Sequence, residues 1–149
     1  MQLLDRDDEL ITPGHTGPAR IVIAMSDLSS VPSLGDAVRE FADRMRALPE
    51  SRLVRRVDAA EELARHLVAW AHGVEHRDHL PPPPIPELPR VGLFVTADQV
   101  AVAGADLVAA ADGLPPDTPV WVDAGARQVP LADVLATAAA AVAQARAAL

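Results

Sequence analysis

The chain of 149 residues contains no cysteine, lysine, asparagine or tyrosine, and only 3% of its residues are aromatic. Without cysteine it has no disulfide, no thiolate nucleophile and no cysteine-ligated zinc or iron–sulfur cluster. Without lysine it has neither a P-loop nor a Schiff-base mechanism. Lysine, asparagine and tyrosine share AT-rich codons, which indicates a GC-rich, bacterial genome. Much of the abundant alanine and arginine is then compositional background.

The chain also has no excess of positive charge and no long apolar runs. Its formal net charge is -8, and its sequence pI is near 4.9, which argues against a nucleic-acid partner because that affinity comes from cations. The first ten residues are acidic, unlike a secretory signal, and no apolar run reaches membrane-spanning length. We therefore expect a cytoplasmic protein with no membrane partner, folded as a single domain over residues 1–149.

Four short apolar runs have the composition of β-strands, being rich in β-branched or aromatic residues and bounded by turn residues. Three of them lack regular alternation with polar residues, which predicts strands that are covered on both faces. The run at 53–57 carries two arginines and suits the edge of a sheet. The four predicted strands cover residues 20–25, 53–57, 91–96 and 119–122.

Between these runs, apolar residues recur at steps of three and four, which predicts helices. The first helix begins at Ser33, whose side chain suits a capping box with Asp36, and it stops before Pro49. A similar cap at Asp58 opens the second helix. The predicted helices cover residues 33–48, 58–79, 105–111 and 131–148.

The alternation of strand and helix predicts an α/β layered sandwich, with a four-stranded, mostly parallel sheet and helices on both faces. The alternative is an α+β fold with a mixed sheet. In that fold residues 99–103 pair with 91–96 as a 91–103 hairpin, and residues 123–126 turn a second hairpin. The proline-rich residues 81–89 predict an extended polyproline II connector inside the domain, with a docking peptide for an aromatic-lined groove as the alternative.

Three of the five histidines lie in the stretch HGVEHRDH, at positions 72, 76 and 79. If the helix continues past Gly73, all three fall in one arc opposite the apolar stripe, which predicts a solvent-facing polar surface. His72 and His76 are four residues apart, so together they could also bind one Zn²⁺ or Ni²⁺ ion. Residues 72–76 match the H-x-x-E-H motif of inverted zincin peptidases. Gly73 and the nearby Pro81 do not suit that motif, so we do not take it as a family resemblance.

An aspartate follows each predicted strand, and in a parallel sheet the carboxyl ends of the strands lie at one edge. Converging carboxylates there could bind Mg²⁺, and a serine-rich first loop leads towards a helix amino terminus that suits anions. Turn and cap roles are the alternative interpretation of these aspartates, and Asp58 is already assigned to a cap. The candidate ligand-binding residues are Asp27, Ser29, Ser30, Asp98 and Asp123.

No motif in the chain is specific enough to define a reaction. We therefore predict a noncatalytic cytoplasmic domain that binds or regulates a protein partner and needs no cofactor. The alternative is a small metal-dependent enzyme that uses the strand-end aspartates with Mg²⁺, or His72 and His76 with Zn²⁺ or Ni²⁺. The last helix has small residues at steps of four and three, which leaves open a homodimer through this C-terminal helix.

Overall fold

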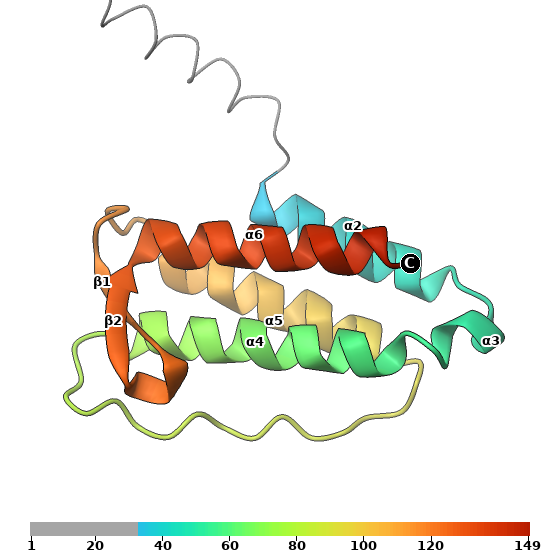
Figure 1. The fold of residues 1–149 in the computed structure, drawn as a ribbon, viewed down its shortest axis with the longest axis horizontal. Helices are drawn as coiled ribbons and strands as arrows, with labels where there is room; N and C mark the ends of the chain where they lie inside the picture. Colours follow the sequence, from blue (N-terminus) through green and yellow to red (C-terminus); the bar gives the residue numbers. More distant parts are fainter. Residues whose placement is uncertain (1–32) are drawn as a thin grey trace, which may run out of the picture. The chain divides into compact units, whose positions relative to one another are not determined.

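Four long helices dominate the computed structural model, which describes residues 33–149 (Figure 1). They are α2 (Leu34–Arg46), α4 (Val57–Glu75), α5 (Thr96–Ala111) and α6 (Leu131–Ala147). A short helix, α3 (Glu50–Leu53), lies between α2 and α4. The strands β1 (Pro119–Val122) and β2 (Arg127–Pro130) form a hairpin between α5 and α6, with the 3-10 turn η1 (Asp123–Gly125) at its tip. The described fold is therefore a helical bundle with a small hairpin at one end.

The predicted α/β sandwich is wrong, because the only sheet within residues 33–149 has two antiparallel strands. Residues 53–57 form the end of α3, a turn and the start of α4. Residues 91–96 form a turn that enters α5, and 99–103 lie inside that helix, so the alternative 91–103 hairpin is wrong too. The β-branched residues at 53–57 and 91–103 suggested strands. In the structure, tertiary packing places these residues in or beside helices instead. The predicted strand 20–25 lies outside the described residues.

The predicted strand at 119–122 and the hairpin turned by residues 123–126 are confirmed. The two strands pair with Val120 opposite Val129 and Trp121 opposite Gln128. Val120 is fully buried, so this side of the hairpin packs against the bundle. The hairpin thereby closes one end of the helical core.

Helix α2 begins as the sequence predicts. Ser33 Oγ accepts a hydrogen bond from the Asp36 amide at 3.2 Å and donates one to the Asp36 carboxylate at 2.8 Å. The hydrogen bond from Ser33 and, next, that from Arg39 lower the pKa of the Asp36 carboxyl. The helix buries Val38, Phe41, Ala42 and Met45, which follow the predicted spacing of three and four.

Helix α4 begins at Val57, one residue before the predicted cap at Asp58. Its N-cap is Arg56, with no side-chain hydrogen bond, and Asp58 lies in the first turn, where the helix dipole favours a carboxylate. The apolar stripe predicted for this helix includes Leu63, Leu67 and Val74, and all three are buried. The stripe was thus predicted correctly, although the cap was not.

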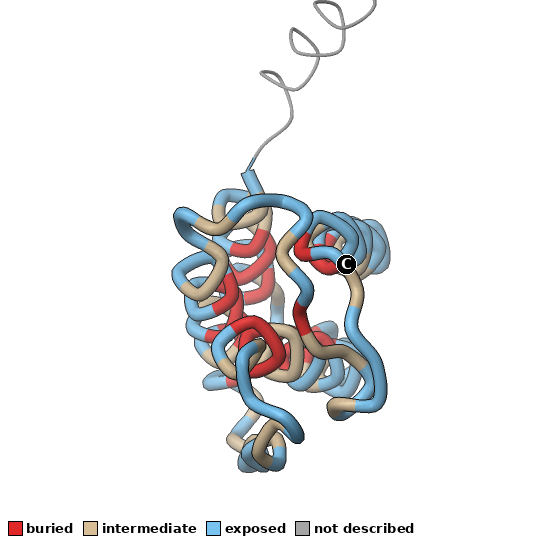
Figure 2. The backbone as a smooth tube through the Cα atoms, turned by 90° about the vertical axis from the view of Figure 1, so that its left-hand side faces the viewer, coloured by how far each residue is buried: buried red, intermediate tan, exposed pale blue. Residues whose placement is uncertain are grey.

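The core contains many small side chains, which let the helices approach one another closely. A Cβ atom at Gly104 of α5 would overlap the Val38 side chain of α2, so these two helices need glycine at this position. The buried stretches of the backbone face one another in the interior of the bundle (Figure 2). Five buried alanines illustrate the pattern: Ala42, Ala64, Ala97, Ala103 and Ala138.

The proline-rich connector joins two helices that run in the same direction. Helices α4 and α5 both point towards the hairpin end, so the chain must return along the length of α4 (Figure 1). The 19 residues of α4 span about 28 Å, and residues 81–89 span about the same length at ~3.1 Å per residue. Gln99 Nε2 donates a 2.8 Å hydrogen bond to the Pro89 carbonyl, which ties the end of the connector to α5. The predicted connector therefore joins two helices, not a helix and a strand.

Helix α6 buries much of the apolar seam that left a homodimer open. Leu131, Ala138 and Val142 of this seam are fully or almost fully buried within the protein. Dimerisation itself stays a prediction, as does a single domain over all of residues 1–149.

Candidate functional site

The carboxyl end of α4 lies against the hairpin. A Cβ atom at Gly73 would overlap the backbone carbonyl oxygen of Trp121, so only glycine lets the two elements approach this closely. Trp121 Nε1 donates a 3.0 Å hydrogen bond to the His79 carbonyl, which fixes the indole over the chain that leaves the helix. Gly73, which suggested a weak helix from sequence alone, is in fact a packing requirement.

His72 is buried, with 8% of its surface exposed, so its predicted solvent-facing position is wrong. Its Nε2 atom lies 2.8 Å from the Pro83 carbonyl oxygen. Because a carbonyl only accepts hydrogen bonds, Nε2 must carry the proton. The proline-rich connector passes over this side of α4 and covers His72. A helical wheel of α4 alone does not include the connector, so it placed His72 in solvent.

His76 and His79 lie beyond the last residue of α4, which ends at Glu75. The ring centroids of His72 and His76 are 4.3 Å apart, and those of His76 and His79 are 5.0 Å apart. The Nδ1 atom of His76 is buried without a hydrogen-bond partner. Among residues 33–149, no group of three or more histidines, aspartates or glutamates is arranged to hold a metal ion. The described part of the chain thus offers a zinc or nickel ion two neighbouring imidazoles and no third ligand.

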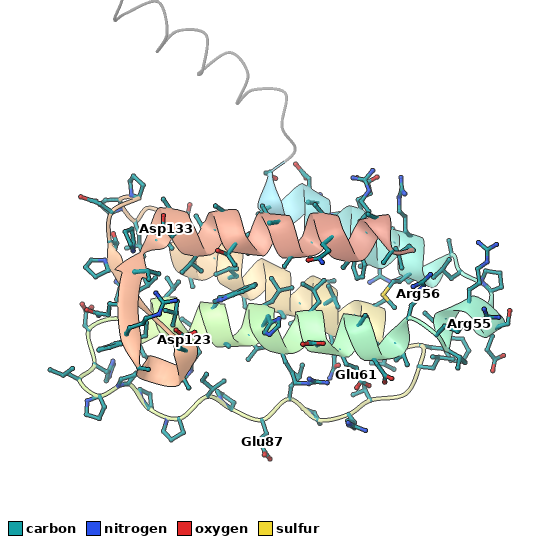
Figure 3. The ribbon with its side chains drawn as sticks, viewed as in Figure 1. Arg55, Arg56, Glu61, Glu87, Asp123 and Asp133 are labelled. Carbon is teal, nitrogen blue, oxygen red and sulfur yellow. The ribbon has the colours of Figure 1, made fainter. Side chains whose placement is uncertain are left out.

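The candidate aspartates do not share one edge. Asp27, Ser29 and Ser30 lie outside the described residues. Asp98, in the first turn of α5, accepts a 2.6 Å hydrogen bond from Arg46 within an ion pair. This hydrogen bond raises the pKa of the Arg46 guanidinium. Asp123 lies on the hairpin turn, where it pairs with Arg127 (Figure 3). Since α5 begins at the end of the bundle opposite the hairpin, the structure does not bring Asp98 and Asp123 together (Figure 1).

A cavity of about 240 Å³ lies between the carboxyl end of α4, the connector and the hairpin. We call it the tryptophan pocket, because both tryptophans of the chain line it. Within it, the rings of His66 and Trp70 stack with centroids 5.5 Å apart and planes tilted by 30°. Sequence reasoning missed this site because its walls come from three segments. The residues with side-chain chemistry are His66, Trp70, His72, Trp121 and Asp123.

A second feature is the exposed side of α5 and the turn before it, which we call the α5 outer face. Of the six large apolar side chains that are exposed within residues 33–149, four belong to this face. Taking the buried Val100 as zero on the helical wheel, Val95, Val102 and Ala109 fall at about 220°, 200° and 180°. The centre of the solvent-facing side is therefore apolar at Val95, Val102 and Ala109. In the first turn it also includes Asp98, at about 160°, which is paired with Arg46. The four large exposed side chains are Phe94 (68% exposed), Val95 (46%), Val102 (61%) and Val108 (40%).

Shallow hollows flank the α5 outer face on both sides. One, of about 410 Å³, lies between α5 and α2 and is lined by Gly35, Ala101 and Val108 among others. The other, of about 290 Å³, lies towards the connector and is lined by Leu88 and Val102 among others. Side chains of a second helix could fill both hollows while its backbone lay over the centre of the face.

The charged residues of α5 and of the segments next to it in the sequence are all acidic. Residues 91–126 contain five aspartates and no arginine or lysine. Asp106 and Asp112 are both exposed beside the apolar centre. Negative charge from α5 therefore borders the apolar stripe, while Arg39 of α2 also lines the hollow beside Asp112. The predicted division of α5 between a strand and a short helix hid this pattern.

Comparisons of the chain with protein-family models, curated protein sequences and solved structures find no significant match. No helix among the described residues has the length and apolar composition that crossing a bilayer requires. A function can therefore be assigned only from the surfaces of the protein itself.

Proposed function

We propose that the protein is a noncatalytic, cytoplasmic interaction domain of bacterial origin, and that its α5 outer face binds an amphipathic helix of a partner protein. The observation that carries this proposal is the line of Val95, Val102 and Ala109 at the centre of the solvent-facing side of α5. Their spacing of seven residues is the spacing at which two packed helices contact each other.

The neighbouring helix α2 shows what an ordinary solvent-facing side looks like in this protein. Its exposed residues form ion pairs, with Arg39 bound to Asp36 and Arg46 bound to Asp43. The outer face of α5 instead leaves valine side chains in water. Burying one valine completely against a partner contributes about 1.5–3 kcal/mol, so a helix that covers two of them has a clear driving force.

The charge distribution favours a basic partner helix over a second copy of this chain. Two α5 outer faces packed together would place the carboxylates of Asp106 and Asp112 near those of the other copy, and facing like charges weaken an interface. Arginine or lysine beside the apolar seam of a partner would instead pair with these carboxylates. We therefore expect a partner helix with an apolar seam and basic flanks.

A synthetic helix tests this proposal directly. The probe has about three heptads, with leucine at the seam positions and arginine at the flanks, and its matched control carries glutamate at the flanks. We expect the arginine peptide to bind the wild-type protein about tenfold or more tightly than the glutamate peptide. Isothermal titration calorimetry measures both affinities.

Two matched variants locate the binding. Val102 and Val54 are exposed to similar extents, 61% and 57%, but only Val102 lies on the α5 outer face. V102D should lower the affinity for the arginine peptide about tenfold or more, and V54D should leave it within about twofold. Equal effects of the two variants, or equal binding of the two peptides, would overturn the proposal. A concentration-dependent dimer that V102D abolishes in analytical ultracentrifugation would show that the occupant is a second copy instead.

A further inference from the structure

The tryptophan pocket is independent of the α5 outer face and has its own chemistry. Its walls include two indole rings, the His66 imidazole stacked on one of them, and the rings of Pro82 and Pro83. Its volume of about 240 Å³ lies below the usual range of about 300–1,000 Å³ for drug-sized ligands. The pocket therefore suits a small molecule or the head group of a larger one.

The electrostatics of the pocket favour a cation. Among residues 33–149, Asp123 is the only carboxylate that lines the cavity, and no arginine of this part of the chain lines it. The Oδ2 atom of Asp123 accepts a hydrogen bond from Arg127 Nε, and Arg127 is not among the residues that line the cavity. Indole rings add negative potential at their faces, where cations bind.

The backbone at the rim of the pocket is held in an uncommon conformation. Asp123 and Ala124 have φ angles of 53° and 57°, in the left-handed region that aspartate tolerates but alanine rarely adopts. Such a conformation of alanine persists only where its surroundings hold it in place. This turn places the carboxylate-bearing residue at the edge of the cavity between the hairpin and α4.

We propose that the tryptophan pocket binds a compact alkylammonium ion, with Trp70 and Trp121 contacting its methyl groups and Asp123 providing the counter-charge. The ion could be a free small molecule or the methylated side chain of a lysine in a peptide, since the two share one head group. Because a desolvated cation is attracted to an aromatic face, the pocket should bind the alkylammonium ion more tightly than a neutral group of the same shape.

The protein contains its own reporter for this site. It has two tryptophans and no tyrosine, and both tryptophans line the pocket, so its intrinsic fluorescence reports on the pocket alone. Choline and its uncharged isostere 3,3-dimethylbutan-1-ol are the matched probes. We expect choline to change the fluorescence saturably and to bind about fivefold or more tightly than the isostere. Equal affinity of the two probes, or no saturable change with choline, would overturn the proposal.

Two variants with the same change in charge separate the pocket from the overall acidity of the protein. D123N keeps a side chain that tolerates the left-handed conformation, and it should lower the affinity for choline roughly threefold without affecting the isostere. Asp117 is exposed and does not line the pocket, so D117N should leave both affinities unchanged. If D117N weakens choline binding as much as D123N does, the pocket does not bind the cation. Tighter binding of a trimethyllysine peptide than of choline would identify a protein side chain as the source.

Discussion

At the scale of single residues, two neighbouring positions near the carboxyl end of α4 determine how the helix meets the hairpin and the connector. His72 was predicted as one of three clustered histidines and Gly73 as a weak point of the helix, and both lie where α4 contacts other elements. Their roles depend on Trp121 and Pro83, which are distant along the sequence but adjacent in the fold. No local pattern contains that information, so the helical wheel placed His72 in solvent.

Glycine is expected to be essential at position 73. In G73A the new methyl group would overlap the Trp121 carbonyl oxygen, a backbone atom that cannot move without displacing the hairpin. We expect a loss of about 1–3 kcal/mol in the free energy of unfolding, measured in urea. The control is G35A in α2, where the added Cβ atom meets only ordinary contacts at 3.8 and 3.9 Å and should stabilise the protein by up to ~1 kcal/mol. If G73A were as stable as G35A, α4 and the hairpin could not lie in contact as described.

At the scale of elements, the helices with large apolar residues or clear stop signals were predictable. Helix α2 has both a cap and a proline that follows its end, and α6 has a continuous seam. Helix α5 was not predicted as a whole, because alanine was treated as compositional background and valine suggested a strand. Its buried residues Val100, Ala103 and Leu107 do follow helical spacing, and counting the alanine would have revealed it.

The cap of α2 makes the pH dependence of stability testable at one residue. S33A should cost about 1 kcal/mol in the free energy of unfolding at neutral pH, while S51A, at an exposed position in α3, should stay within ~0.5 kcal/mol. Because the pKa of Asp36 is lowered in the folded state, its contribution is present above its unfolded pKa of about 3.9 and is lost as the pH falls through the folded value.

Carboxyl-carbon NMR titration measures this effect at Asp36 itself. In S33A the pKa of Asp36 should rise towards its ordinary value, because the hydrogen bond from Ser33 is its largest cause of lowering. The stability difference between wild type and S33A should therefore narrow below about pH 4. An unchanged pKa of Asp36 in S33A would mean that the cap is not formed.

At the scale of the whole molecule, the topology could not be predicted from periodicity. A pattern of apolar residues shows which face of a helix is buried, but it does not show which element covers that face. The parallel arrangement of α4 and α5 requires a connector as long as α4 itself, and the proline-rich segment meets that requirement. The proline-rich composition predicts an extended segment, but it does not show which two helices the segment joins.

The stiffness of the connector should contribute to stability through the unfolded state. Pro84 is exposed, and residues 82–90 belong to no helix or strand. We expect P84A to lower the free energy of unfolding by about 0.4–1 kcal/mol, because alanine gives the unfolded chain more conformations to lose. The dependence of that free energy on urea concentration should stay unchanged, which shows that the folded state is intact. A stabilised P84A would show that proline strains the connector.

The most direct test of the account is an amide NMR map of the protein titrated with the arginine-flanked helix. Our proposal predicts that the largest shift changes fall within residues 94–109 and that they disappear in V102D, while the rest of the bundle stays unperturbed. Shift changes that cluster on α6 or around the tryptophan pocket, or that persist in V102D, would contradict it.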